Sequence, residues 1–418
     1  MTEKKIMNRW LTVVGAILIQ LSLGAIYAWS VFTPTLIKEA HWSKVDTQIV
    51  FGLGLAFFAI VMVIAGRLMP KVGPRVLAIV GGIVLGSGYI LAGLIDPTNF
   101  WVLALFIGVM GGSGIGLAYV VPIEVGMKWF PDKKGLITGL AVAGFGFGAM
   151  LWVKLAGAWG QLIATHGLGN TFIIYGIIFM FSIVLGGTWM VCPPECWAPE
   201  GWEPPEQKEG ESNDIITDLS SSKMLRTPQF YIIFLTFMFS AGAGLMSIGL
   251  MKIFPKEALI ANKIGLVEAS AIAGTAMAIF FSLANGIGRV AWGAISDKLG
   301  RKNSLVINIA TQGIFVILFQ WTAGTPVLLF LSATVIGFNF GGNFALFPTI
   351  TADIFGVKNI AQNYGWIFLA YGVGGILFPI LGGKLGDMGN FPLAFSICGV
   401  LCLIFAVVIA FVKPPKNA

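Results

Sequence analysis

The chain has 418 residues, of which 57% are hydrophobic and only 11% are charged. Soluble domains usually spend about 25% of their residues on charge, so this composition excludes an ordinary soluble domain and requires a lipid bilayer around most of the surface. The formal net charge of +7 does not indicate a nucleic-acid partner, because the basic residues fall in short clusters between apolar runs.

Apolar runs separated by charged or Pro/Gly-containing turns predict an all-α membrane protein. Each run is long enough to cross a hydrocarbon core of about 30 Å, and none alternates polar with apolar residues as a membrane β-barrel strand does. The first run is too long for the core of a cleavable signal. The predicted spans are residues 10–34, 48–68, 75–95, 100–124, 135–160, 171–191, 229–251, 266–291, 304–323, 326–350, 361–384 and 391–412.

The longest hydrophilic stretch divides these spans into two groups of six. It is acidic and contains several prolines and serines, so we expect a flexible linker, with a short surface helix near its end at 218–225. The predicted domains are therefore an N-terminal six-helix half at 1–192, a cytoplasmic linker at 193–227 and a C-terminal six-helix half at 228–418. Most lysines and arginines between spans lie on the side of the N-terminus, which places both termini in the cytoplasm.

The two halves repeat each other. Residues 66–75 follow the second span as residues 293–302 follow the eighth, and Pro348 follows Pro122 by 226 residues (348 − 122). Two parallel repeats of six spans are typical of transporters whose substrate site lies near the membrane midplane between the halves.

Residues 293–302 carry the feature of the sequence that is most specific to one family. Their pattern of Gly293, Asp297, Lys298, Gly300 and Arg301 resembles the cytoplasmic-loop signature of the major facilitator superfamily at every defined position. The first copy, at 66–75, has Pro70 where the signature has aspartate. The resemblance implies the twelve-helix fold of that superfamily, with 293–302 acting as a gating loop.

A narrower resemblance is to the oxalate:formate antiporter family and bacterial monocarboxylate transporters. It rests on short segments spread over both halves: Asn8-Arg-Trp10, Tyr27-Ala-Trp-Ser30, Trp129-Phe-Pro-Asp-Lys-Lys-Gly135, Leu225-Arg-Thr-Pro-Gln-Phe230, Phe338-Asn-Phe-Gly-Gly342 and Asn363-Tyr-Gly365. This resemblance implies a secondary transporter in the inner (plasma) membrane of a bacterium, with no enzymatic activity, cofactor, metal or obligatory protein partner.

Arg289, within the eighth span, is the main candidate for substrate binding. A charge at membrane depth costs at least about 2.5 kcal/mol and therefore usually faces an aqueous cavity or a partner. The planar guanidinium can donate two parallel hydrogen bonds to a carboxylate. The family resemblance implies that the arginine of the eighth span binds the substrate carboxylate. Asn285 lies four residues earlier on the same helical face and is expected to contact a hydroxyl or keto oxygen. The alternative is an arginine that snorkels to the nearby interface.

The eleventh span departs from the oxalate-type pattern, which has a second cation after the Asn-Tyr-Gly motif. The position is Tyr371 in this chain. Since each buried carboxylate needs its own compensating charge, one cation favours a monoanion over oxalate. Aromatic residues are expected to shape the rest of the site, although any one of the 33 phenylalanines is more often a packing residue. The candidates are Tyr27, Tyr119, Phe145, Phe340, Phe344, Phe368 and Tyr371.

Other charged and reactive residues have simpler interpretations. Lys154 lies roughly 30 Å along a helix from Lys134, so we expect it to snorkel to the outer interface. Glu124 and Lys128 are spaced to form an i, i+4 pair. The cysteines show no disulfide or metal-site spacing and are expected to be structural thiols. They are Cys192, Cys196, Cys398 and Cys402.

The predicted function is transport of a small monocarboxylate of the L-lactate or pyruvate type by alternating access, with a proton. An organic anion exchanger of oxalate/formate type is the alternative. Proton coupling needs a route other than Asn285, because that amide cannot titrate. The sequence shows neither the ring of pore-lining charges typical of channels nor a phosphate-binding loop.

Overall fold

The computed structural model describes residues 7–42, 44–157, 159–194, 197–199, 218–251 and 254–415. Within these ranges, twelve helices are long and apolar enough to cross a membrane, which confirms the predicted all-α class and the number of spans. The chain forms two compact units, Met1–Ser212 and Asn213–Ala418. The predicted linker falls largely on residues 200–217, outside the described residues, so its boundaries stay a prediction.

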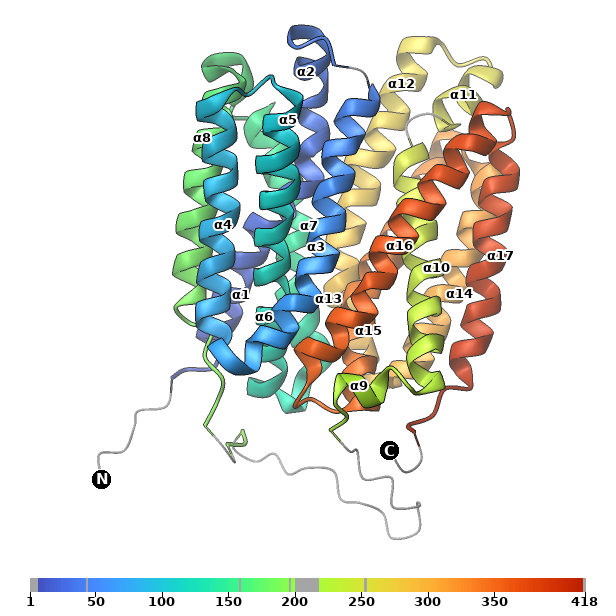
Figure 1. Cartoon of the computed structure of the whole chain (residues 1–418). Coiled ribbons are helices and arrows are strands. Elements are labelled where there is room, and N and C mark those ends of the chain that lie inside the picture. The colour runs from blue at the N-terminus through green and yellow to red at the C-terminus, as the bar shows by residue number, and fades with distance from the viewer. Residues whose placement is uncertain are drawn as a thin grey trace. The chain divides into compact units, whose positions relative to one another are not determined.

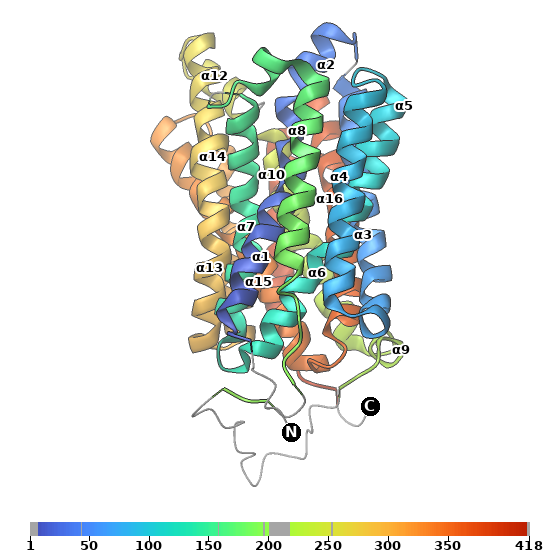
Figure 2. The same cartoon turned by 90° about the vertical axis from the view of Figure 1, so that its left-hand side faces the viewer.

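The first unit contains six of these spans, several of which are built from consecutive helical segments (Figures 1 and 2). Its packing is dominated by the pairs α4 with α8, α3 with α6 and α1 with α7. The elements are α1 (Trp10–Leu23), η1 (Gly24–Val31), α2 (Thr33–Glu39), α3 (Lys44–Val72), α4 (Pro74–Ile95), α5 (Phe100–Leu103), η2 (Ala104–Gly111), α6 (Gly112–Trp129), η3 (Pro131–Lys133), α7 (Lys134–Ala156) and α8 (Leu162–Gly187).

The second unit contains the other six spans and the end of the predicted linker. Its main packing pairs are α10 with α16, α13 with α15 and α14 with α17. The elements are α9 (Ser221–Met224), α10 (Pro228–Leu250), α11 (Phe254–Ala261), α12 (Leu266–Thr275), η4 (Ala276–Phe281), α13 (Ser282–Leu299), α14 (Arg301–Thr322), α15 (Pro326–Phe355), α16 (Ile360–Asp387) and α17 (Phe391–Ala410).

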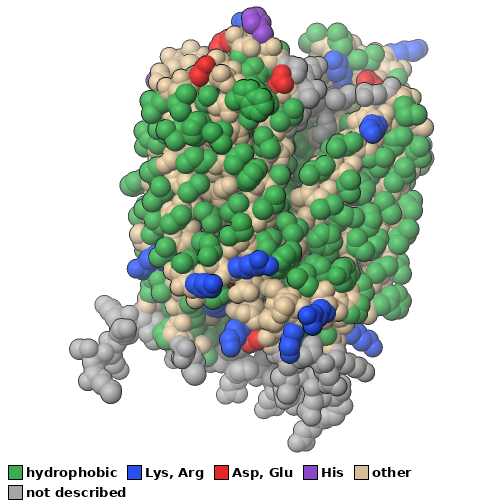
Figure 3. All heavy atoms as spheres, viewed as in Figure 1, with side chains coloured by type: hydrophobic (Ala, Val, Ile, Leu, Met, Phe, Trp, Pro, Cys, Tyr) green, Lys and Arg blue, Asp and Glu red, His purple; other side chains and the backbone are tan. Residues whose placement is uncertain are grey.

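Apolar side chains point outward along the flanks of both units. Phe181 is 70% exposed in the first unit and Val327 is 74% exposed in the second, and Figure 3 shows hydrophobic side chains over the flanks with Lys and Arg toward the ends. A soluble protein would not present this much contiguous apolar surface. The distribution is the one expected of helices that contact lipid tails.

The sequence signature at 293–302 is mostly helical rather than a loop, which corrects its predicted conformation. The helix α13 continues to Leu299, and α14 begins at Arg301, so Gly300 alone separates them. Gly300 has φ +83°, and Gly73 has φ +81° at the same place between α3 and α4. A Cβ atom at either glycine would contact nothing within 4 Å. Glycine is therefore favoured here for its left-handed backbone and not for lack of space.

The last part of the predicted linker is docked onto the second unit. The backbone N–H of Leu219 donates to the Phe355 carbonyl at 2.9 Å, and the Asn363 amide donates to the Leu219 carbonyl at 3.0 Å. Asp218 accepts from the backbone N–H of Lys358 at 3.0 Å. The predicted surface helix is shorter than expected and spans only Ser221–Met224. We call residues 218–224 the docked segment.

Candidate functional site

The helix α13 places Arg289 in the interior, where its side chain is 0% exposed. Its Nε–H donates to the side-chain oxygen of Asn285 at 3.2 Å, a contact that the i, i+4 spacing permits. Its guanidinium carbon lies 4.2 Å from the centroid of the Phe344 ring on α15. Neither of these contacts carries a negative charge. The amide of Asn285 and the ring of Phe344 thus help to fix where the guanidinium lies on α13.

Glycines bring the backbones of α13 and α15 close enough for this contact. A Cβ atom at Gly288 would lie 2.0 Å from the Phe338 carbonyl oxygen, and one at Gly341 would lie 2.1 Å from the Asn285 carbonyl oxygen. Such separations are far inside van der Waals contact, so these positions accept only glycine without movement of a helix. Gly341 belongs to the Phe338–Gly342 segment, whose structural role is thus to let α15 approach the arginine helix.

Four of the predicted aromatic residues form a continuous cluster beside Arg289. Ring centroids are 5.3 Å apart for Phe340 and Phe344, 5.5 Å for Phe344 and Tyr371, and 5.0 Å for Phe368 and Tyr371. Phe237 on α10 also belongs to this cluster, with its ring 6.0 Å from Phe368. Sequence reasoning missed Phe237, because nothing in its neighbourhood distinguishes it from the other phenylalanines.

The remaining predicted aromatic residues form a second cluster, inside the first unit. Phe145 on α7 lies 5.2 Å from Tyr27 on η1 and 5.5 Å from Tyr119 on α6. Phe58 on α3 was not predicted and lies 5.0 Å from Tyr119. The candidate binding residues thus gather in two clusters, one in each unit, and the cation belongs to the second.

Two residues of the predicted gating motif, Arg301 and Asp297, belong to a charged network at the junction of α13, α14 and α15. Arg301 contacts Asp297 at 2.6 Å, Asp353 at 3.3 Å and the Ser296 hydroxyl at 2.6 Å. Three different atoms of one guanidinium make these contacts, so Arg301 links the start of α14 to the ends of its two neighbours. Gly293 is buried in α13, and Lys298 is exposed.

An analogous junction in the first unit explains two of the short motifs. Arg9 lies 3.3 Å from Asp132, and its guanidinium carbon lies 4.4 Å from the centroid of the Phe130 ring. Trp10 also packs edge-on against Phe130, with the centroids 5.1 Å apart. The segments Asn8–Trp10 and Trp129–Gly135 therefore form one contact, between the start of α1 and the connection from α6 to α7.

The other charged and reactive residues that the sequence singled out have simple surroundings within their own units. Glu124 and Lys128 form the predicted i, i+4 ion pair on α6, and Lys154 is half-buried near the end of α7. The Cys192 thiol lies 3.8 Å from Lys128 Nζ. Burial raises the pKa of this thiol, while the lysine charge acts in the opposite direction. Cys398 and Cys402 are buried and free, as Cys192 is free, and Cys196 lies outside the described residues.

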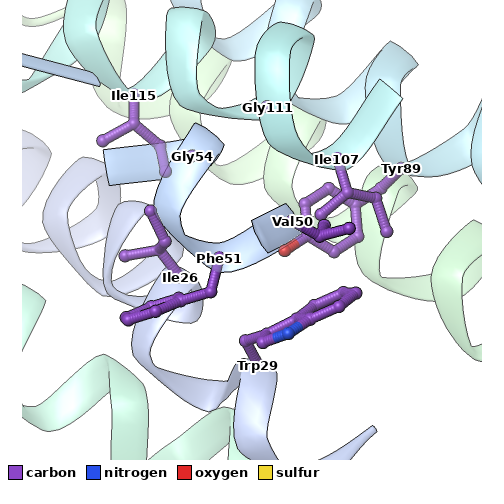
Figure 4. A pocket seen from close by; sticks show the side chains of 9 residues that line it. All are labelled: Ile26, Trp29, Val50, Phe51, Gly54, Tyr89, Ile107, Gly111 and Ile115. Atoms are coloured by element: carbon purple, nitrogen blue, oxygen red, sulfur yellow. The ribbon is translucent and has the colours of Figure 1, made fainter. Parts of the chain in front are cut away.

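A small cavity in the first unit contains none of the predicted residues (Figure 4). Its walls come from η1, α3, α4, η2 and α6, and they are almost entirely apolar. This lining offers no charged group to an anion. The lining residues are Ile26, Trp29, Val50, Phe51, Gly54, Tyr89, Ile107, Gly111 and Ile115.

Comparison with known proteins identifies the family. The profile of the Major Facilitator Superfamily matches residues 13–280 and 256–418. The uncharacterized MFS-type transporter YhjX of Escherichia coli is 33% identical over 88% of this chain and 86% of its own length. The oxalate:formate antiporter of Oxalobacter formigenes is 28% identical over 97% and 92%. The apicoplast pyruvate carrier 1 of Toxoplasma gondii is 23% identical over 88% and 82%.

The fold agrees with a solved structure of the same superfamily. The FucP transporter in its outward conformation superposes with a TM-score of 0.67 at 16% identity, covering 96% of this chain and 98% of the other. These matches confirm both resemblances predicted from the sequence motifs. The chain is a multi-pass membrane transporter and belongs to the major facilitator superfamily.

Proposed function

We propose that the protein carries a small monocarboxylate of the L-lactate or pyruvate type across the membrane by alternating access, together with a proton. The observation that carries the proposal is the fully buried guanidinium of Arg289, which contacts Asn285 and Phe344. A planar guanidinium binds one carboxylate through two parallel N–H···O bonds and stays charged at every relevant pH. We further propose that both termini are cytoplasmic and that the membrane is a bacterial inner membrane.

The charge balance of the second unit favours a monoanion. At the position where the oxalate-type pattern has its second cation, the chain has Tyr371, whose buried ring packs 5.5 Å from Phe344. If a dianion bound at Arg289, its second carboxylate would lie among aromatic rings without a cation beside it. Burying that unpaired charge would weaken binding of the dianion. A monocarboxylate leaves no such charge, and its apolar end suits the aromatic rings.

Anion exchange of the oxalate/formate type is the second candidate. It is favoured by the similarity to the oxalate:formate antiporter, which extends over 97% of this chain. It is also favoured by the chemistry of the site, since Asn285 cannot take up a proton and Arg289 does not release one. An empty site with a buried cation reorients unfavourably, and exchange avoids that step.

Uptake of labelled L-lactate and pyruvate into proteoliposomes tests the proposal. We expect uptake to rise when an inward proton gradient is imposed, and to fall on the order of 100-fold or more in Arg289→Gln, because the bound carboxylate then loses its partner. The exposed arginine before α10 supplies a matched control, Arg226→Gln, which should transport like wild type. Uptake that appears only with anion inside the vesicles would support exchange. No lactate or pyruvate flux, with oxalate flux in the same vesicles, would refute the proposed substrate class.

A further inference from the structure

We infer that Trp292 and Asn339 position the Arg289 guanidinium by fixing how α13 sits along α15. The inference rests on the proposed role of Arg289 in binding a carboxylate, and it assigns to the two residues an indirect role in substrate affinity. Neither residue is proposed to touch the substrate.

A directional hydrogen bond joins the two helices. The indole N–H of Trp292 on α13 donates to the side-chain oxygen of Asn339 on α15 at 3.1 Å. Both residues are buried, with 6% and 2% of their surface exposed. Trp292 follows Arg289 by three residues and thus lies on the same side of α13. Asn339 immediately precedes Phe340 and lies five residues before Phe344.

A third helix holds the Asn339 amide in one orientation. Its Nδ2 donates to the Thr311 hydroxyl on α14 at 2.9 Å, and the Asn308 amide donates to the Asn339 backbone carbonyl at 3.0 Å. An indole N–H can only donate, so the amide atom that faces Trp292 has to be the oxygen. The hydrogen bonds therefore determine which amide atom is the oxygen. Asn339 offers that oxygen, already oriented, as an acceptor to Trp292 on α13.

This bond matters because the glycine contacts between the two helices determine how close the backbones come more than how they align lengthwise. Gly288 and Gly341 let the backbones of α13 and α15 approach to contact, as small residues do between membrane helices. The glycines present no side chains that interlock, so the register depends on the side chains around them, which include Trp292 packed 6.0 Å from Phe338. A single polar contact in an apolar interior is a well-attested way of choosing one register among several.

A change of register would remove Arg289 from its aromatic partner. One helical turn corresponds to about 5.4 Å, whereas a cation–π contact requires the cation within about 6 Å of the ring centroid. The present separation is 4.2 Å, so even a partial slide weakens the contact and turns the guanidinium plane. Trp292 and Asn339 thus control where the carboxylate-binding group points.

The test uses Trp292→Phe, which keeps an aromatic ring but removes the N–H donor. We expect the KM for the transported monocarboxylate to rise about five- to tenfold, with the maximal rate per folded protein nearly unchanged. Trp321→Phe on α14 is the matched control, since Trp321 is 66% exposed. Asn339→Ala and the variant with both substitutions complete a double-mutant cycle. The KM of the double variant should be no higher than that of Asn339→Ala alone.

A second measurement does not depend on transport. The Nε–H of Arg289 gives a 15N–1H signal that is shifted by the Phe344 ring and is assigned by its loss in Arg289→Lys. In Trp292→Phe the signal should move toward its position in Phe344→Leu. A wild-type KM and an unmoved signal in Trp292→Phe would overturn the inference. If wild type carries no monocarboxylate, the proposed function fails, and the signal alone then decides whether Trp292 positions Arg289.

Discussion

The guanidinium carbon of Arg289 lies over the ring of Phe344, 4.2 Å from its centroid. A full positive charge on α13 therefore rests on the negative face of an aromatic ring on α15. The ring stabilises the cation and adds no negative charge of its own.

Replacing Phe344 by leucine tests how much the contact between Arg289 and Phe344 contributes to substrate affinity. The cation–π interaction is worth about 0.5–2 kcal/mol, so we expect the KM of Phe344→Leu to rise roughly 2- to 30-fold. The KM should be largely restored in Phe344→Tyr, which keeps the ring face. Phe411→Leu serves as control, because Phe411 is 77% exposed at the end of α17. A leucine variant with unchanged KM would show that the ring merely fills space.

Introducing a second cation at Tyr371 should change the preferred substrate. In Tyr371→Lys an ammonium group would enter the aromatic cluster that surrounds Arg289, and two buried like charges repel unless a dianion lies between them. We therefore expect the thermal stability of this variant to rise with added oxalate and its lactate transport to weaken. Tyr371→Phe should keep the wild-type preference. If Tyr371→Lys still preferred lactate to oxalate, the argument that one buried cation selects a monoanion would be wrong.

Exchanging Arg301 for lysine should impair the transport cycle without altering substrate binding. Arg301 contacts Asp297, Asp353 and Ser296 through different nitrogen atoms, and the single ammonium group of lysine cannot reproduce that fork. Arg301 lies beyond the end of α13, whose last residue, Leu299, is ten positions and roughly 15 Å along the helix from Arg289. We expect a lower maximal rate with a KM close to wild type. A large increase in KM with an unchanged maximal rate would contradict this assignment.

The glycine seam between α13 and α15 predicts a strong effect of one added methyl group. In Gly341→Ala the new Cβ would lie 2.1 Å from a backbone oxygen, which only a helix shift can relieve, and overpacking of this kind costs about 1–3 kcal/mol or more. We expect a lower unfolding temperature and weaker transport. Gly274→Ala is the matched control, because nothing lies within 4 Å of its added Cβ. Equal unfolding temperatures for the two variants would contradict the predicted packing.

Removing the Asn363 side chain should release the docked segment 218–224. Asn363 is fully buried, donates to the Leu219 carbonyl at 3.0 Å and accepts from the Ser221 hydroxyl at 2.9 Å. In Asn363→Ala we expect faster amide hydrogen exchange at Leu219 and through α9, measured by mass spectrometry. Asn303→Ala, at an exposed asparagine, should leave that exchange unchanged. Exchange at wild-type rates in Asn363→Ala would show that the segment is held by other contacts.

The sequence was sufficient to predict the spans, because twenty apolar residues in succession leave few alternatives to a membrane helix. It also indicated Arg289, since a charge within an apolar run is conspicuous, and it placed Asn285 on the same face by helical spacing. Both inferences depend only on neighbours along the chain. The twelve spans and the family are confirmed, while the binding roles of these residues stay predictions.

Contacts between segments far apart in the sequence could not be predicted from neighbours along the chain. Phe344 on α15 is a candidate from the sequence, but no pattern there places its ring over Arg289, and no local pattern distinguishes Phe237 from the other phenylalanines. Leu219 is held through its backbone atoms, and hydrogen bonds of backbone atoms cannot be predicted from the type of the residue. The helical signature around Gly300 was interpreted as a loop, because its charged residues resemble a solvated turn until the single left-handed glycine is known.

Competition against uptake of labelled L-lactate by wild-type protein tests the central claim most directly, namely that one buried cation selects one carboxylate. Unlabelled pyruvate and other small monocarboxylates should inhibit uptake at concentrations near the KM for lactate, and oxalate should inhibit much less, because its second carboxylate finds no compensating charge at Tyr371. Strong inhibition by oxalate with little inhibition by pyruvate would contradict the account.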